Sequence, residues 1–393
     1  MKIAGVVCEY NPFHNGHAYH LRQTRKAGAT HIVAVMSACF VQRGTGAFCD
    51  PFARARAAVR CGADLVLELG VPYACASAGV FAFGAIETLA AFGVDLLSFG
   101  AETPELALLC QAANTLSNEA LQAEIGKLCA QGIGYPAAAQ TVLENAHGAA
   151  VADVLRTPNN TLAVEYIKAA NNCGAPVSFL PVQRIGAAHD AAAPSGKIVS
   201  AKALREMPDR NDILPFLPPA AAQELFSPET LFFDEASFET ALLCTLRQQS
   251  AMDMERCIAD DSGLASRLFA ASKTATDLPS LLAAAQTKSV TAAKVRRAAL
   301  HCFLNLEKEW QRTRPPFLHV LAANDRGLEL LRKASPTLPL ITKHRETGLL
   351  SEKAQAFYAL QCRVTDVYTA LCRPRGQAGL LQRHSMDVLH VDA

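Results

Sequence analysis

The segment EYNPFHNGH, residues 9–17, decides how the chain folds and where we expect a ligand to bind. The apolar run KIAGVVC, residues 2–8, precedes it and predicts a buried β-strand. Residues 17–27 follow with a helical pattern. The segment therefore joins a first strand to a first helix. In an open α/β sheet, ligands bind at this carboxyl end of a strand.

The alternation of strand and helix patterns continues from there. Further strands are expected at residues 30–37, 64–69, 95–99 and 176–185, and helices at residues 51–62, 77–92 and 160–172. Helices of this length between strands predict right-handed crossovers and a parallel sheet. The fold class expected is α/β, with a Rossmann-like nucleotidyltransferase domain over residues 1–212.

The character of the chain changes after Pro215, Pro218 and Pro219, which mark a linker or a turn. Residues 220–310 read as helical without a clear strand pattern, and 350–372 read as a further helix. Residues 337–342 are compatible with a short strand. We expect a second, mainly α-helical domain over residues 213–393.

The composition excludes several classes of protein. With 37 basic and 36 acidic residues the formal net charge is +1, so contact with nucleic acid requires a local basic patch. The 13 cysteines are scattered and form no C-x-x-C pair, which favours reduced thiols over a disulfide framework. No apolar run is long enough to cross a membrane, and the N-terminus does not resemble a signal peptide. We expect a cytoplasmic protein without a membrane partner.

The start of the first helix has the chemistry of a phosphate site. A helix N-terminus offers free backbone N–H groups and a positive dipole end. Gly16 removes a side chain so that a nucleotide can lie close, and His14 and His17 can donate hydrogen bonds to phosphate oxygens. The alternative is that both histidines are ordinary caps at the surface.

Other residues fall at the same edge of the expected sheet or at helix starts, namely Arg43, Gly100, Asn159 with Asn160, Arg184, Ser200 and Arg205. Arginines and helix starts suit anions, and amides can read a base or a ribose. Each also has a plain alternative as a loop arginine, a turn glycine or a helix cap. Asp50, Asp64 and Glu68 could help hold Mg²⁺ indirectly, and the sequence does not choose among them.

A local basic segment lies in the second half of the chain. Residues 288–316 carry seven basic residues against two acidic ones, a local net charge of +5; the basic residues are Lys288, Lys294, Arg296, Arg297, Lys308, Arg312 and Arg314. Such a cluster can contact the phosphates of a nucleic acid, and Trp310 within it could stack on a base. The alternative is a solvated helix face with a buried tryptophan.

These motifs together resemble a known family. EYNPFHNGH, FVQRG, ADLVLEL, FGAE, TPNN, QRIG and SAKALR occur in the order seen in bacterial tRNA(Met) cytidine acetate ligases, members of the H-x-G-H nucleotidyltransferase superfamily. The resemblance covers at least residues 1–205 and extends to KSVTAAKVRR at residues 288–297.

The resemblance implies a reaction in two steps with ATP, Mg²⁺, acetate and elongator tRNA(Met). Acetate attacks the α-phosphate of ATP, giving acetyl-adenylate and pyrophosphate, and the acetyl group then passes to N4 of the wobble cytidine. His14 and His17 would be the catalytic pair that steadies the phosphates. Arg43, Lys288, Lys294, Arg296 and Arg297 would contact tRNA. The implied ATP site comprises Val7, Cys8, Glu9, Tyr10, Asn11, Pro12, Phe13, His14, Asn15, Gly16, His17, Ala18, Tyr19, His20, Gly100, Asn159, Arg184, Ile185, Ser200 and Arg205.

The chain departs from the usual family pattern at Ala38-Cys39, Pro51, Gly70 and Lys202. The departures near Cys39 and Pro51 lie where acetate selection and tRNA docking would be affected. Two other functions are compatible with the sequence: a small-molecule adenylyltransferase, which keeps AMP in its product, and a non-catalytic RNA- or nucleotide-binding protein.

Overall fold

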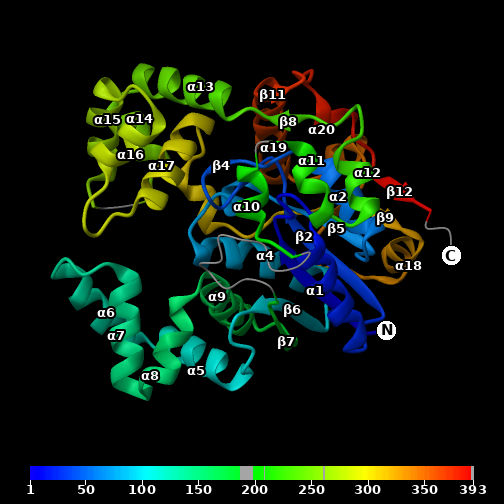
Figure 1. Cartoon of the computed structure of the whole chain (residues 1–393), viewed down its shortest axis with the longest axis horizontal. Helices are drawn as coiled ribbons and strands as arrows, with labels where there is room; N and C mark the ends of the chain where they lie inside the picture. Colours follow the sequence, from blue (N-terminus) through cyan, green and yellow to red (C-terminus); the bar gives the residue numbers. More distant parts are fainter. Residues whose placement is uncertain (186–197, 208, 260–261, 391–393) are drawn as a thin grey trace.

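The computed structural model describes residues 1–185, 198–207, 209–259 and 262–390 (Figure 1). Its main sheet has the strand order β10-β9-β5-β2-β1-β6-β7, with β12 also paired to β9. These strands are β1 (Ile3–Cys8), β2 (His31–Ser37), β5 (Leu65–Leu69), β6 (Leu96–Ala101), β7 (Ser178–Gln183), β9 (Leu318–Asn324), β10 (Leu340–Ile341) and β12 (Asp387–Leu389). Two small ladders pair β3 (Phe40–Val41) with β4 (Thr45–Gly46), and β8 (Phe232–Phe233) with β11 (Cys372–Arg373).

Helices surround this sheet and extend away from it. Those before residue 200 are α1 (Asn15–Lys26), α2 (Pro51–Arg60), α3 (Val71–Ala74), α4 (Ala78–Phe92), α5 (Leu106–Ser117), α6 (Glu119–Ala130), α7 (Tyr135–His147), α8 (Ala149–Ala152), the 3-10 turn η1 (Asp153–Arg156) and α9 (Pro158–Cys173). Those after it are α10 (Ala201–Glu206), α11 (Arg210–Ile213), η2 (Leu214–Phe216), α12 (Pro219–Leu225), α13 (Glu235–Gln248), α14 (Ala251–Cys257), α15 (Leu264–Thr274), α16 (Leu278–Ala285), α17 (Ala292–Leu304), η3 (Lys308–Arg312), α18 (Asp325–Lys333), η4 (His344–Leu349), α19 (Glu352–Ala370) and α20 (Leu380–Arg383). Figure 1 shows α5–α8 and α13–α17 as two groups on the same side of the sheet.

The central strands form the predicted parallel core. β1 pairs in parallel with β2 on one side and with β6 on the other. Their side chains are buried along nearly their whole length, as expected for strands covered by helices on both faces. Because the chain turns from β1 to β2 in one direction and reaches β6 in the other, the crevice between β1 and β6 is the topological switch point. Ligands bind in this crevice in open α/β sheets.

Two strands of the sheet, β9 and β12, were not expected from the sequence. β9 lies in the part predicted to be mainly helical, and it pairs antiparallel with β5. Its other edge pairs in parallel with β10 and β12. The run Phe317–Ala323 is apolar except for His319 and is buried on both faces, so it closes the outer side of β5. The division of the chain at residue 212 stays a prediction, while strands from beyond that point complete the same sheet.

None of the described helices combines the length and the apolar character that a membrane crossing requires.

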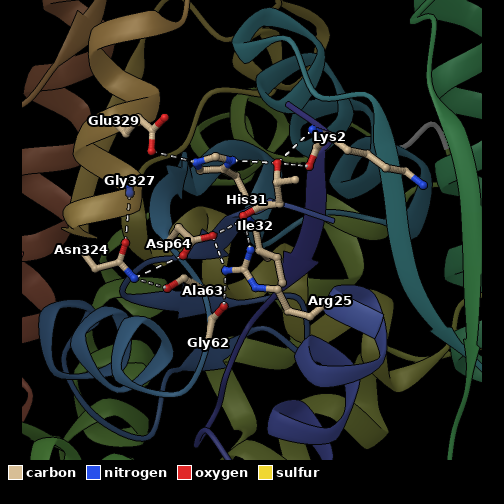
Figure 2. Close-up of polar contacts among 11 residues, drawn as sticks. Lys2, Arg25, His31, Ile32, Gly62, Ala63, Asp64, Asn324, Gly327 and Glu329 are labelled. Carbon is tan, nitrogen blue, oxygen red and sulfur yellow. Dashed lines mark hydrogen bonds and ion pairs between the residues drawn. The ribbon is translucent and has the colours of Figure 1, made fainter. Parts of the chain in front are cut away.

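Asp64 joins β9 to the sheet at the amino-terminal end of the parallel strands (Figure 2). Its carboxylate accepts hydrogen bonds from Arg25 at the end of α1 and from the Ile32 backbone N–H at 2.6 Å. Its other oxygen accepts from Asn324 Nδ2 at 3.3 Å, and Asn324 caps α18 through the Gly327 N–H. Asp64 is 1% exposed. A single buried carboxylate therefore connects α1, β2, β5, β9 and α18.

We expect Asp64→Asn to destabilise the protein by about 2–4 kcal/mol, because Arg25 loses its charge partner and the amide group places a donor against other donors. Urea unfolding followed by circular dichroism measures this loss. Glu329→Gln is the matched control, since its carboxylate lies 3.7 Å from His31 and is 42% exposed. Equal stability of the Asp64→Asn variant and the wild type would contradict this assignment.

Candidate nucleotide site

His14 and His17 form a reciprocal cap at the start of α1. The backbone of His14 is extended, with φ −141° and ψ 174°. Its Nδ1 accepts a hydrogen bond from the Gly16 N–H at 3.0 Å, and Nδ1 of His17 accepts one from the His14 N–H at 3.2 Å. The two rings stack with centroids 3.7 Å apart. The pair satisfies backbone donors at the helix start in the manner of a capping box.

These hydrogen bonds fix where each ring carries its proton. A backbone N–H is always the donor, so Nδ1 of both rings must be unprotonated. A neutral imidazole then carries its proton on Nε2. Both histidines therefore act as caps through one nitrogen and present an N–H donor on the other, which is the group that a phosphate oxygen accepts.

The surroundings keep both rings neutral. Burial, together with the charges of Arg184 and Arg205, lowers the pKa of His14 to about 3. The pKa of His17 is well below its usual range because of burial, then because of His14 and Arg184. His14 is 6% exposed, so it is not the surface cap of the alternative interpretation.

Gly16 makes room for the imidazole of His14. A Cβ at this position would lie 2.7 Å from Cε1 of His14 and 3.0 Å from its Nδ1. Any side chain here would push the ring out of the cap. The expectation that Gly16 lets a nucleotide approach stays a prediction, and the contact seen in the structure is with the protein itself.

The loop between β1 and α1 is held from several directions. Tyr10 has a left-handed backbone with φ 44°, and the peptide bond between Asn11 and Pro12 is cis. Oδ1 of Asn11 accepts from the Phe48 N–H at 2.6 Å, and its carbonyl oxygen accepts from Arg205. The rings of Phe13 and Tyr10 pack edge to face, with centroids 4.8 Å apart. The loop is thus a rigid part of the core.

Several residues of the predicted ATP segment face the core instead of the crevice. Val7, Cys8 and Ala18 pack within the sheet and helix layers. Nε2 of His20 lies 2.9 Å from the Ser98 hydroxyl of β6, and burial followed by the Arg184 charge lowers the pKa of His20 to about 4. Asn15 donates to the Pro215 carbonyl at 3.4 Å, while Tyr19 is half-buried on α1.

A buried arginine that the sequence analysis did not single out supports the carboxyl ends of β1 and β2. Arg54 on α2 is fully buried, and its guanidinium donates to carbonyl oxygens of Glu9 at 2.7 Å and Ser37 at 2.9 Å. It also donates to the carbonyls of Ala38 and Cys49. Arg54 therefore connects the ends of β1 and β2 to the loop that precedes α2.

A second cluster lies at the end of β6. Arg184 extends across Gly100, where a Cβ would stand 3.4 Å from its Cγ. The Arg184 guanidinium donates to Asn159 Oδ1 at 3.4 Å and lies 3.6 Å from Glu102. Glu102 also accepts from Asn159 Nδ2 at 2.5 Å and from the Asn160 N–H at 3.2 Å. The structure brings Gly100, Asn159 and Arg184 together, and Glu102 holds them; its place in FGAE was the available signal.

The remaining predicted ATP residues lie close to this crevice or at its rim. Ser200 caps α10 by accepting from the Ala203 N–H at 3.2 Å. Arg205, on the same helix, reaches the Asn11 carbonyl and lies within electrostatic range of His14. Ile185 is 43% exposed at the end of β7. Gly186 of the QRIG motif lies outside the described residues.

Part of the predicted tRNA surface is assembled beside this crevice. The loop after β3 carries Arg43, which is exposed, and Gly44, where a Cβ would meet the backbone of Arg296 and Arg297 at 3.0 Å. Gly44 has φ 82°, which favours glycine. Lys288 is exposed before α17, and Lys294 lies in its first turn. Trp310 is half-buried against Phe357, with centroids 5.4 Å apart.

The carboxylates considered for Mg²⁺ are engaged with protein donors. Asp50 caps α2 through the Phe52 and Ala53 N–H groups, at 3.1 and 2.9 Å. Asp64 is the buried junction of Figure 2, at the opposite edge of the sheet. Glu68 lies 2.5 Å from Nδ1 of His319 in the core. Within the described residues no group of histidines, cysteines and carboxylates is arranged to hold a metal ion.

The departures from the family pattern have structural explanations. Ala38 and Cys39 are buried, and the Cys39 thiol lies 3.6 Å from the Thr365 hydroxyl. Pro51 occupies the first turn of α2, where its missing N–H is not needed. A Cβ at Gly70 would stand 2.6 Å from Phe357 Cζ. Lys202 is exposed on α10, 3.7 Å from Glu206.

These features define a nucleotide-binding protein of the α/β nucleotidyltransferase class. The profile of the HIGH Nucleotidyl Transferase family matches residues 1–382. A tRNA(Met) cytidine acetate ligase of Syntrophotalea carbinolica is 35% identical over 361 residues, covering 87% of this chain and 85% of that protein. The ligase of Limosilactobacillus reuteri is 35% identical over 357 residues, covering 87% and 90%. The chain therefore belongs to the HIGH nucleotidyl transferase family and, within it, to the tRNA(Met) cytidine acetate ligases.

Solved structures agree with this assignment. The crystal structure of Thermotoga maritima TmcAL without ligand superposes with a TM-score of 0.91 at 28% identity, covering all of both chains. The structure of the same protein bound with alpha-thio ATP gives 0.89 at 27% identity, also over the whole of both chains. The resemblance and the fold class expected from the sequence are confirmed.

The neutral state of His14 makes stability depend on pH. The ordinary pKa of histidine is about 6.5, so below that pH the unfolded chain binds a proton that the native ring does not. The contribution is complete above pH 6.5 and is lost as the pH falls toward 3. We expect His14→Asn, which can still cap Gly16, to lose less unfolding free energy than the wild type between pH 7 and 5. A His14 ring titrating near pH 6.5 by NMR would contradict this.

Glu102→Gln should weaken ATP binding about tenfold, because Arg184 and Asn159 lose the carboxylate that orients them. Calorimetric titration with a non-hydrolysable ATP analogue measures the dissociation constant. Glu105→Gln is the control, since Glu105 is exposed and makes no cap hydrogen bond to α5. Equal affinity in the Glu102→Gln variant and the wild type would remove Glu102 from the site.

Proposed function

We propose that this protein is an ATP-dependent ligase that activates acetate as acetyl-adenylate and transfers the acetyl group to N4 of the wobble cytidine of elongator tRNA(Met). The observation that carries the proposal is the pair of neutral histidines at the switch point, each with its Nε2 proton directed by the cap. The choice of substrates is based on the names of the relatives and on the alpha-thio ATP complex of Thermotoga maritima TmcAL.

The first step needs binding and charge stabilisation at phosphorus. His14 and His17 would donate Nε2–H hydrogen bonds to phosphate oxygens, on which negative charge builds as acetate attacks the α-phosphate. Arg184 and Arg205 add positive charge near the pair, since both act electrostatically on His14. Neutral imidazoles hold their donors in place without a proton transfer. Positioning and electrostatics therefore account for the step without a covalent intermediate on the protein.

Mg²⁺ would accompany the nucleotide. The carboxylates of Asp50, Asp64 and Glu68 are occupied by protein donors, so the chain offers no ready set of metal ligands among its described residues. The ion would be held by phosphate oxygens and water, which is usual for Mg²⁺ at nucleotide sites. The roles of the two histidines and the two arginines do not depend on the ion.

The tRNA would approach from the side of α17. Gly44, which follows Arg43, packs on the backbone of this helix at Arg296 and Arg297. Among the described residues, none of these three arginines has a carboxylate partner in an ion pair. Such groups are suited to phosphate. This arrangement would bring the anticodon to the crevice that holds the adenylate.

We expect incubation with ATP, Mg²⁺, labelled acetate and unmodified elongator tRNA(Met) to place label in the wobble cytidine, with release of AMP and pyrophosphate.

His14→Asn or His17→Asn should lower acetate-dependent pyrophosphate release about 10²- to 10³-fold, because a donor to the transition state is lost. His147→Ala, on the exposed end of α7, is the control.

Two outcomes would contradict the proposal. AMP retained in a small-molecule product would identify an adenylyltransferase instead. Binding of ATP or tRNA without any acetate-dependent pyrophosphate release would identify a non-catalytic binding protein.

A further inference from the structure

Glu9 places a carboxylate at the carboxyl end of β1, directly beside the switch point. Its backbone oxygen accepts from Arg54 at 2.7 Å, and its Oε1 accepts from the Gln42 N–H at 2.9 Å. The side chain is half-buried. Among the described residues no group donates to Oε2, so the carboxylate is anchored through one oxygen and offers the other.

This carboxylate lies between the His14 and His17 pair at the start of α1 and the basic residues of α17. On one side, Arg205 binds the Asn11 carbonyl and interacts electrostatically with both Glu9 and Arg43. On the other side, the segment Gln42–Gly44 packs on α17 at Arg296 and Arg297.

The chemistry of a carboxylate excludes direct binding of the anionic substrates. Oε2 of Glu9 would repel phosphate oxygens and the carboxylate of acetate, so it does not serve the implied ATP site as a phosphate ligand. A carboxylate accepts N–H protons, and the reaction contains one amine that must lose a proton, N4 of the cytidine. The neighbouring carboxylates are already in use, since both oxygens of Glu235 accept from the Thr45 hydroxyl and Glu102 holds Asn159.

We propose that Glu9 is the proton acceptor of the acetyl-transfer step. The N4 lone pair attacks the acetyl carbonyl carbon and forms the C–N bond. The bond from that carbon to the phosphate oxygen breaks, and AMP leaves with the electron pair. The proton lost from N4 passes to Oε2 of Glu9 and then to solvent. This inference rests on the proposed function and adds the group that completes its second step.

The test separates the two steps in Glu9→Gln. The amide oxygen of glutamine can still accept from the Gln42 N–H, so the loop keeps its anchor. Acetate-dependent exchange of pyrophosphate into ATP reports the first step. Single-turnover transfer from preformed labelled acetyl-adenylate to elongator tRNA(Met) reports the second. We expect transfer to slow by about 10²-fold or more, the usual contribution of a general base, and exchange to fall far less.

Glu9→Asp keeps a carboxylate, and we expect it to recover part of the transfer rate that Glu9→Gln loses. Equal losses in exchange and transfer would overturn the proposal, because Glu9 would then serve the adenylate site. Transfer at the wild-type rate in Glu9→Gln would also overturn it. Failure of the wild type to exchange pyrophosphate or to transfer acetate would instead refute the proposed function, and the wild type is therefore measured before the variants are compared.

Discussion

The buried guanidinium of Arg54 is the constraint on which the site depends. It draws together the carbonyl oxygens at the ends of β1 and β2 and that of Cys49, at a position that solvent does not reach. Carbonyl groups that leave a sheet edge would otherwise remain without partners, at a cost of about 1–3 kcal/mol each. With these ends fixed, Glu9, the loop to His14 and the segment after β2 have one arrangement.

The two ends of the parallel strands have different roles. At the carboxyl ends, imidazole, guanidinium and amide groups converge on the crevice between β1 and β6. At the amino ends, Asp64 gathers Arg25, Ile32 and Asn324 into a closed junction whose polar groups satisfy one another. The first arrangement keeps donors available to a ligand, while the second uses them within the protein. The polar groups at the amino ends are thus used for stability, while those at the carboxyl ends are the ones proposed for binding.

The sequence predicted the parallel core well, because its strands are apolar, short and separated by helices with clear caps. It did not predict β9, because this run lies among helical patterns and its antiparallel pairing with β5 depends on distant residues. The reason for Gly16 was also invisible, since the contact of a Cβ with the His14 ring depends on a rotamer. Arg54 was passed over because its partners are backbone carbonyls, which leave no pattern in the sequence. Glu102 was passed over although it stands in the FGAE motif, because its amide partner Asn159 is remote in the sequence.

The late position of β9 has a consequence for folding during synthesis. Strands β1, β2, β5, β6 and β7 are all made before residue 184, yet the outer edge of β5 is covered only when residues 318–324 emerge. Until then the nascent chain exposes unpaired backbone groups on a mostly apolar strand, the kind of edge that promotes aggregation. The ribosome must therefore translate more than a hundred further residues before this strand is covered and protected from self-association.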